Sequence, residues 1–392
     1  MENLIDLLTL ERARAYAIAT MIVGCFLVFH NFASAPEEIS GGIDFPAFYN
    51  AGRILNEYPR GDLYDQELQH RLYLEVAPSA GDERLFAYTP FFALFFSPLA
   101  LLPFFWALVC WMVISLILFT AGFWLAWSAT DLPIEYRHSG FLIAVSFLPF
   151  FAWCVLAGQS SAFGFFSLAL AIYLDRKNPF LSGWELALLL YKPPLLILLV
   201  PMLVVTKRWR TLAGFGATAA VLVLISIVVI GLSGIHSYVE MLRSFSHTKS
   251  AGVTRVDIDL FSFFLLLFGP VAAKWFVAVI AVIVIPSLVV VWTKEPMYAW
   301  ALAITWTLIL NFYVLIYDST LIILPVLLVA STLWRPGLPR AFRWLLLLLF
   351  LVAWPEAIVA QKFGFQLLTV VVVAFGIYQI VVSRYEPVLT TP

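Results

Sequence analysis

The carboxylate of Asp44 is the first side chain along this sequence that is placed to do chemistry. It opens a polar stretch, residues 41–65, in a chain that is otherwise strongly apolar. Two glycines come shortly before it and Phe45-Pro46 follows it, which is typical of the first turn of a helix. An aspartate at this position either caps the helix, its more common role, or stands at the mouth of a site as a reactive group. The residues alone leave both interpretations open.

Two further charged residues lie next to long apolar runs, where a charge is costly. Lys192 precedes a double proline, and Asp318 precedes Ser319. A charge at membrane depth costs at least about 2.5 kcal/mol, so each residue needs a partner, water or a function. Lys192 either reaches the membrane surface or binds a phosphate, and the bend fixed by the prolines favours phosphate. Asp318 either lines a pocket or caps a span that begins at Ser319, and the cap is favoured.

Further polar residues lie near the ends of apolar runs on the side of the membrane that also holds Asp44, and they could converge with Asp44, Lys192 and Asp318 on one site. Gln159 is either part of a plain turn or a hydrogen-bonding partner of a substrate, and His247 either contacts an anion or belongs to a solvated loop. The full set of candidate site residues is Asp44, Tyr49, Tyr88, Gln159, Lys192, His247 and Asp318.

Metal ligands are sparse in this sequence. The five histidines form no HExxH motif, and the cysteines have no metal-like spacing. The three cysteines each lie inside an apolar run: Cys25, Cys110 and Cys154. Asp257 and Asp259 have the spacing of a metal-binding DxD pair, but Asp259 is equally placed to cap a helix that begins at Leu260. We therefore expect no metal at the site, and the role of these two aspartates stays open.

The composition identifies a polytopic membrane protein. Hydrophobic residues make up 62% of the 392 residues and charged residues only 12%, whereas charged residues are about a quarter of a soluble domain. The net charge of -1 leaves no basic face for nucleic-acid phosphates. The expected partners are therefore membrane lipids and no nucleic acid.

The apolar runs predict an all-α protein with about 12 transmembrane helices in one integral membrane domain, residues 1–392. Lys and Arg in alternate turns place both termini in the cytoplasm. The external loop 34–90 should carry short amphipathic helices at the membrane surface, and a second external loop covers 235–259. Residues 181–206 are too long for one span and too short for two, which predicts two short helices that meet at a bend around Lys192.

Several motifs occur in order between residues 44 and 194, and together they resemble glycosyltransferase family 87. They are Asp44-Phe-x-x-Phe-Tyr49-x-Ala-Gly52, Asp62-Leu-Tyr-Asp65, Tyr88-Thr-Pro-Phe-Phe-Ala-Leu, Pro98-Leu-Ala-Leu-Leu-Pro103, Gly158-Gln159 and Lys192-Pro193. The resemblance implies the fold of the glycosyltransferase C superfamily. It also implies a polyprenyl-phosphate sugar as donor, mannose or another hexose, and a lipid-linked or envelope acceptor. Inversion at the sugar carbon without an obligatory metal or cofactor would follow.

The resemblance also implies roles for the candidate residues. Asp44 would be the catalytic base on the extracytoplasmic side of a bacterial-type plasma membrane. Lys192, Gln159, Tyr88 and His247 would hold the donor and its phosphate, and Tyr49 and Asp318 would line the pocket. Family members often carry a histidine beside the aspartate of a late span, whereas tyrosine precedes Asp318 here. A transporter or lipid flippase is the alternative, since it also needs broken helices and charges at depth, but the sequence lacks paired broken segments in two matching halves.

Overall fold

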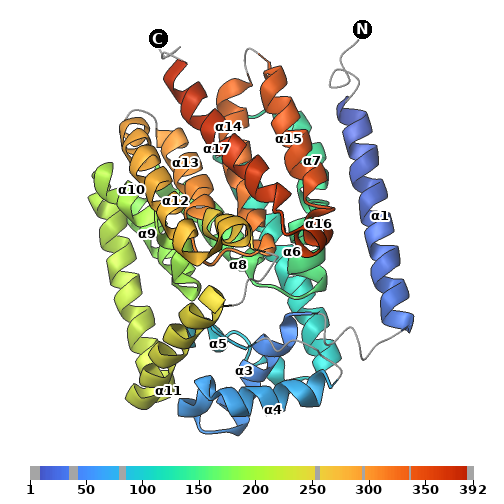
Figure 1. Cartoon of the computed structure of the whole chain (residues 1–392), viewed down its shortest axis with the longest axis vertical. Helices are drawn as coiled ribbons and strands as arrows, with labels where there is room; N and C mark the ends of the chain where they lie inside the picture. The colour runs from blue at the N-terminus through green and yellow to red at the C-terminus, as the bar shows by residue number, and fades with distance from the viewer. Residues whose placement is uncertain are drawn as a thin grey trace.

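The computed structural model describes residues 9–34, 43–78, 85–251, 257–293, 296–334 and 337–385, and its regular secondary structure is helical. In this part of the chain, the extended pairing is a single isolated bridge between Asp257 and Leu315. Long helices lie side by side, and a smaller group of short helices covers one end of them (Figure 1). The all-α class predicted from the sequence is therefore confirmed.

Among the described residues, five helices are long and apolar enough to cross a membrane, or up to seven if each of two bent pairs is one span. The five are α6 (Phe104–Ser128), α11 (Trp209–Ala251), α12 (Leu260–Trp292), η8 with α14 (Ile316–Ile322 and Ile323–Leu333) and α17 (Leu367–Tyr385). The bent pairs are α7 (Arg137–Val145) with η5 (Pro149–Leu156), and α15 (Arg340–Val352) with α16 (Glu356–Phe363). The shorter apolar helices include α8 (Ser161–Asp175) and α13 (Pro296–Ile309). The predicted number of twelve crossings therefore stays a prediction.

The helix break around Lys192 is present, as predicted. Short pieces follow one another: α9 (Pro179–Ala187), η6 (Leu188–Tyr191), η7 (Pro193–Leu196) and α10 (Leu199–Val205). Lys192 itself has non-helical dihedrals, φ -136° and ψ 81°, because a residue before proline avoids the helical region. The break leaves Lys192 inside the bundle, only 3% exposed.

The helix that follows Asp44 is buried, which corrects the expectation that it lies on the membrane surface. In α3 (Phe45–Glu57) ten residues are buried, and a Cβ at Gly52 would lie 2.4 Å from the carbonyl oxygen of Phe96. The Phe48 ring lies 4.8 Å from that of Phe96, centroid to centroid. The covering elements are η2 (Arg60–Tyr64), α4 (Gln66–Val76), α5 (Pro90–Ala93) and η3 (Leu99–Leu101). Of the two predicted surface helices, only α4 has the expected division into a buried and an exposed face.

The external loop predicted for residues 235–259 is largely helical. Helix α11 continues to Ala251 across a break at Gly231, where φ is +70°, a conformation that glycine adopts without strain. Its second part packs on η2, with the rings of Tyr64 and Tyr238 4.8 Å apart. This packing joins α11 to the group of short helices at that end.

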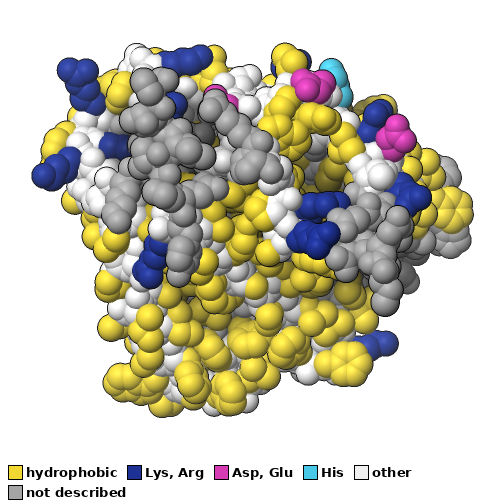
Figure 2. Space-filling model, turned by 90° about the horizontal axis from the view of Figure 1, so that it is seen from above, with side chains coloured by type: hydrophobic (Ala, Val, Ile, Leu, Met, Phe, Trp, Pro, Cys, Tyr) yellow, Lys and Arg dark blue, Asp and Glu magenta, His cyan; other side chains and the backbone are white. Residues whose placement is uncertain are grey.

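The two ends of the molecule differ in the helices that they hold, and one of them is rich in Lys and Arg. Helix α1 (Leu10–Ser34) begins, and α17 ends, at the end opposite to α3 and α4 (Figure 1). Viewed from that end, the surface displays more Lys and Arg than Asp and Glu side chains (Figure 2). Such an excess of positive residues is typical of the cytoplasmic ends of spans.

Candidate active site

Asp44 is buried where α3 begins, with 8% of its surface exposed. Its backbone N–H donates to the carbonyl of Ala157 at 2.9 Å, which ties α3 to the turn that precedes α8. The side chain makes no capping hydrogen bond to α3, and instead accepts one from Nε2 of Gln159. The carboxylate is thus directed at the Gly158-Gln159 turn, and the capping interpretation is wrong for this side chain.

Gln159 links Asp44 to Tyr88. Its Oε1 accepts hydrogen bonds from the Tyr88 hydroxyl at 3.2 Å and from the Ser160 N–H at 3.3 Å. The turn depends on Gly158, which has φ +73° and whose added Cβ would lie 2.6 Å from that of Phe45. Burial raises the pKa of Tyr88, so its hydroxyl keeps its proton and acts as a donor. These contacts form one buried chain from the phenol through the amide to the carboxylate.

Lys192 and Asp318 form a buried ion pair. The Lys192 Nζ lies 2.5 Å from Oδ2 of Asp318, and their side chains are 3% and 0% exposed. The same carboxylate accepts from the Ser161 Oγ at 3.1 Å and from the Leu315 N–H at 3.0 Å. A buried ion pair is tolerated when further hydrogen bonds satisfy its oxygens, as they do here. By accepting the N–H of Leu315, the residue before η8, the Asp318 side chain also closes the first turn of that helix. The carboxylate therefore has a capping role, one helical turn earlier than expected, and holds the lysine as well.

Aromatic rings surround the ammonium group of Lys192. Its Nζ lies 4.9 Å from the ring centre of Tyr313 and 4.8 Å from that of Tyr317, distances at which a cation is attracted to the ring face. Burial, followed by the charges of Asp257 and Asp318, raises the pKa of Tyr313. The ammonium is therefore held between one carboxylate and two neutral phenols.

The Tyr88–Gln159–Asp44 chain of hydrogen bonds and the Lys192–Asp318 pair are neighbours. Ser161, which contacts Asp318, follows Gln159 by two residues, and the ring of Tyr88 stacks on that of Tyr191 at 5.9 Å with an interplanar angle of 5°. Five of the seven candidate residues thus come together: Asp44, Tyr88, Gln159, Lys192 and Asp318. Sequence reasoning missed Ser161, Tyr191 and Tyr313, although two of these lie within two residues of a candidate.

The structure does not place the other two candidate residues in this cluster. The Tyr49 hydroxyl donates to the carbonyl of Leu102 at 2.9 Å, so Tyr49 fastens α3 to the chain before α6. The side chain of His247 lies outside the described residues, so its role in binding the donor stays a prediction. Among the described residues, no hydrogen bond or ion pair joins Tyr49 to the cluster.

Asp257 and Asp259 act within the protein. Asp259 caps α12 by accepting from the Ser262 N–H at 2.7 Å, and Asp257 accepts from the Ser262 hydroxyl at 3.1 Å. Both are fully buried. In the described parts of the chain, no group of three or more His, Cys, Asp or Glu residues could hold a metal ion. The capping interpretation of Asp259 is therefore confirmed.

The arrangement offers a carboxylate to take a proton and an ammonium group to bind an anion. Asp44 accepts a hydrogen bond from the Gln159 amide, and a carboxylate has about four lone-pair sites that can accept. Lys192 has three donors, of which one points to Asp318. A proton acceptor beside an anion-binding cation suits the transfer of a group away from a phosphate.

The model of glycosyltransferase family 87 matches residues 86–316, which is more than half of the 392 residues. The matched range contains Tyr88, Gln159 and Lys192, begins after Asp44 and ends two residues before Asp318. No curated protein and no solved structure matches the chain.

Proposed function

Since this chain belongs to glycosyltransferase family 87, and so is a membrane glycosyltransferase, we propose that it uses a polyprenyl-phosphate sugar as donor. The sugar would be mannose or another hexose, and the acceptor a lipid-linked or other envelope molecule. Family membership favours sugar transfer over the alternative of a transporter or flippase. No metal or cofactor is assigned a step in this proposal.

The observation that carries the proposal is the buried contact of Asp44 with Gln159, beside the Lys192–Asp318 pair. In the proposed reaction an acceptor hydroxyl oxygen attacks the first carbon of the sugar while Asp44 takes the hydroxyl proton. The bond from that carbon to the phosphate oxygen breaks, and its electron pair leaves with the phosphate. Because the attack comes from the side opposite to the leaving group, the configuration at that carbon is inverted. Lys192 would stabilise the negative charge of the departing phosphate.

We further propose that the end of the molecule with α3 and α4 faces the extracytoplasmic side of a bacterial-type plasma membrane. Both termini would then lie in the cytoplasm. The excess of Lys and Arg at the end where α1 begins and α17 ends supports this orientation (Figures 1 and 2). The full set of about twelve crossings belongs to the same proposal.

The test is sugar transfer by the purified protein in lipid vesicles, with radiolabelled polyprenyl-phosphate-mannose and an envelope-lipid extract. Asp44→Asn should lower the transfer rate by at least about 100-fold, since general bases contribute about 10² to 10⁴. Asp62→Asn, in η2 of the same polar segment, is the matched control and should keep the wild-type rate.

Full transfer by Asp44→Asn would refute the assignment of the base. Movement of the labelled lipid across the vesicle membrane, without a labelled product from the wild type, would instead favour the transporter.

A further inference from the structure

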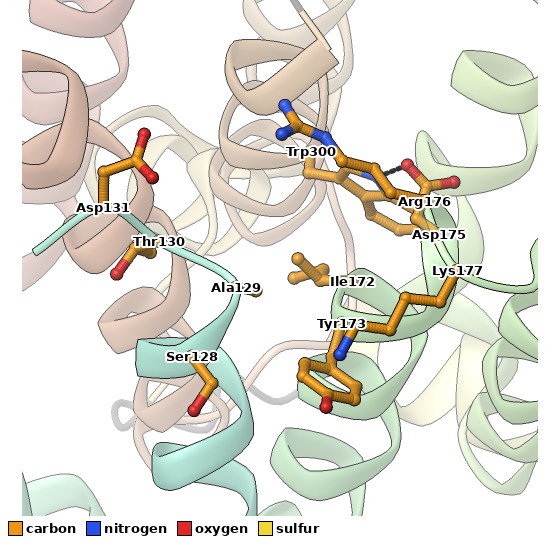
Figure 3. A pocket seen from close by; sticks show the side chains of 10 residues that line it. All are labelled: Ser128, Ala129, Thr130, Asp131, Ile172, Tyr173, Asp175, Arg176, Lys177 and Trp300. Carbon is orange, nitrogen blue, oxygen red and sulfur yellow. Dashed lines mark hydrogen bonds between the residues drawn. The ribbon is translucent and has the colours of Figure 1, made fainter.

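A cavity of about 200 Å³ lies at the end of α8 remote from the candidate active site. Helix α8 has 15 residues, so its two ends are about 20 Å apart. The cavity is lined by the turn after α6, by the last residues of α8 and by Trp300 of α13 (Figure 3). It is thus separate from the cluster around Asp44 and Lys192.

The acidic residue in the α8 wall of this cavity already has partners. Asp175 pairs with Arg208 and accepts a hydrogen bond from the indole N–H of Trp300 at 3.1 Å. Its negative charge is therefore balanced within the protein. It also fixes the Trp300 ring as part of the cavity wall (Figure 3).

The two residues after Asp175 are exposed cations. Arg176 and Lys177 line the cavity, and neither forms an ion pair with any residue that the structure describes. The Lys177 Nζ lies 3.6 Å from the ring centre of Tyr173, a contact that directs part of the ammonium at the ring and leaves its outward N–H groups able to bind an anion. This wall therefore attracts negative charge.

The facing wall carries the opposite charge. Asp131 follows the end of α6, and its backbone N–H donates to the hydroxyl of Ser331 at 2.9 Å, which fixes its position. Its side chain is exposed and forms no ion pair within the described residues. Figure 3 shows Asp131 across the cavity from Arg176 and Lys177. A ligand that fills the cavity would meet positive charge on one side and negative charge on the other.

We propose that this cavity binds a phospholipid headgroup that carries a phosphate diester and a primary ammonium group, as in phosphatidylethanolamine. The phosphate would contact Arg176 and Lys177, because guanidinium and ammonium groups bind phosphate oxygens well. The ammonium would contact Asp131. This site is independent of the proposed sugar transfer and goes beyond it.

Size and setting favour a headgroup over a larger soluble ligand. The cavity of about 200 Å³ is smaller than the roughly 300 to 1,000 Å³ of typical small-molecule sites. Trp and Tyr side chains are enriched where spans leave the membrane, and Trp300 and Tyr173 line this cavity. Basic pockets between transmembrane helices bind the phosphates of anionic lipid headgroups, and Asp131 in the facing wall adds a partner for an ammonium group.

The experiment is native mass spectrometry of the full-length protein in detergent, titrated with dioleoyl phosphatidylethanolamine, phosphatidylglycerol or phosphatidylcholine. Wild type should bind phosphatidylethanolamine most tightly. Arg176→Gln with Lys177→Gln should weaken it at least about tenfold, the effect of losing one hydrogen bond to a charged group. Asp131→Asn should remove the preference for phosphatidylethanolamine over phosphatidylglycerol. Arg210→Gln, an exposed residue that does not line the cavity, is the control and should bind as wild type does.

Equal binding of phosphatidylethanolamine and phosphatidylglycerol by the wild type, or unchanged binding by the double variant, would overturn the proposal. Glycerophosphoethanolamine, which has no acyl chains, tests the source of the headgroup. Displacement of the lipid by an equal concentration of this compound would overturn the lipid assignment in favour of a soluble phosphate ester. Gel filtration and thermal unfolding of each variant verify that it is folded.

Discussion

Lys192 and Asp318 stabilise each other in a place where neither charge is tolerated alone. Removing one partner of a buried pair costs about 3–5 kcal/mol, because the other charge stays buried and uncompensated. Lys192→Met should therefore lower the free energy of unfolding by about this amount. Adding Asp318→Asn should recover most of the lost stability, since a neutral amide then replaces the unpaired carboxylate. Sugar transfer should stay lost in the double variant if Lys192 binds the donor phosphate.

The measurements for this pair are thermal unfolding and the dependence of transfer on donor concentration. The control is Arg53→Met, which breaks a more exposed pair with Glu75 at 2.9 Å and should cost no more than about 1 kcal/mol. A double variant that is folded and transfers sugar at the wild-type rate would limit Lys192 to a structural role.

Gln159 should matter more to transfer than Tyr88 does. Gln159→Leu removes the amide that contacts Asp44, whereas Tyr88→Phe removes only the hydroxyl that donates to the Gln159 Oε1. Loss of that one hydrogen bond should slow transfer about two- to tenfold, and Gln159→Leu should slow it further. The initial rate of product formation measures both effects. A slower Tyr88→Phe variant than Gln159→Leu would contradict this order.

Polar residues next to glycine and proline were the part of the site that could be predicted from the sequence. Gln159 follows Gly158 and Lys192 precedes Pro193, and Asp44 lies two residues from a glycine and from a proline. Such positions, where a helix bends or ends, leave side chains free to converge. Tyr49 lies inside α3, where spacing indicates which residues share a face but not which element covers each face. Its hydroxyl reaches the carbonyl of Leu102, a contact 53 residues away that no local pattern encodes.

At the scale of elements, the sequence predicted helix breaks better than helix environments. The predicted break at Lys192 is present, and the structure shows another at Gly269-Pro270, because proline removes a helical hydrogen bond and glycine adopts positive φ. The burial of α3 was not predicted, since an amphipathic pattern is the same whether the polar face meets water or protein. The structure also bends by 69° before Glu356, directly after Pro355.

The crossing of α9 and α11 depends on glycine. A Cβ added at Gly214 would lie 2.0 Å from the backbone oxygen of Phe180, whereas one added at Gly216 would meet nothing within 4 Å. Gly214→Ala should therefore push the two helices apart and lower the free energy of unfolding by about 1–3 kcal/mol. Gly216→Ala, on the same helix, should leave the free energy of unfolding unchanged or raise it by up to about 1 kcal/mol.

Thermal unfolding of the two purified glycine variants, with wild type alongside, checks this difference. Equal stability of the two variants would show that α9 and α11 do not approach each other as closely as the structure has them.

At the scale of the whole molecule, the distribution of charge could be predicted from the sequence, while the number of crossings could not. The positive residues lie in turns that the sequence marks clearly, and Figure 2 shows Lys and Arg side chains on the end where α1 begins and α17 ends. Counting spans requires knowing which short apolar helices cross the membrane. Helices as short as α8, with 15 residues, fall below the roughly 20 residues that a span needs. Whether such a helix crosses depends on its neighbours, which composition does not determine.

The orientation of the molecule gives the last prediction. In a background with Cys25→Ala and Cys110→Ala, only the buried Cys154 remains. Glu67→Cys on α4 and Arg210→Cys in the first turn of α11 then each place a thiol at an exposed position. Helix α4 lies at the lower end of the molecule in Figure 1, and α11 begins well above it.

A maleimide that cannot cross membranes should label the Glu67→Cys variant in intact cells. It should label the Arg210→Cys variant only after permeabilisation, because α4 would be extracytoplasmic and the start of α11 cytoplasmic. The background protein without either substitution is the control and should stay unlabelled. The reverse order of labelling would place the Asp44 cluster near the cytoplasmic side, where the proposed extracytoplasmic reaction could not take place.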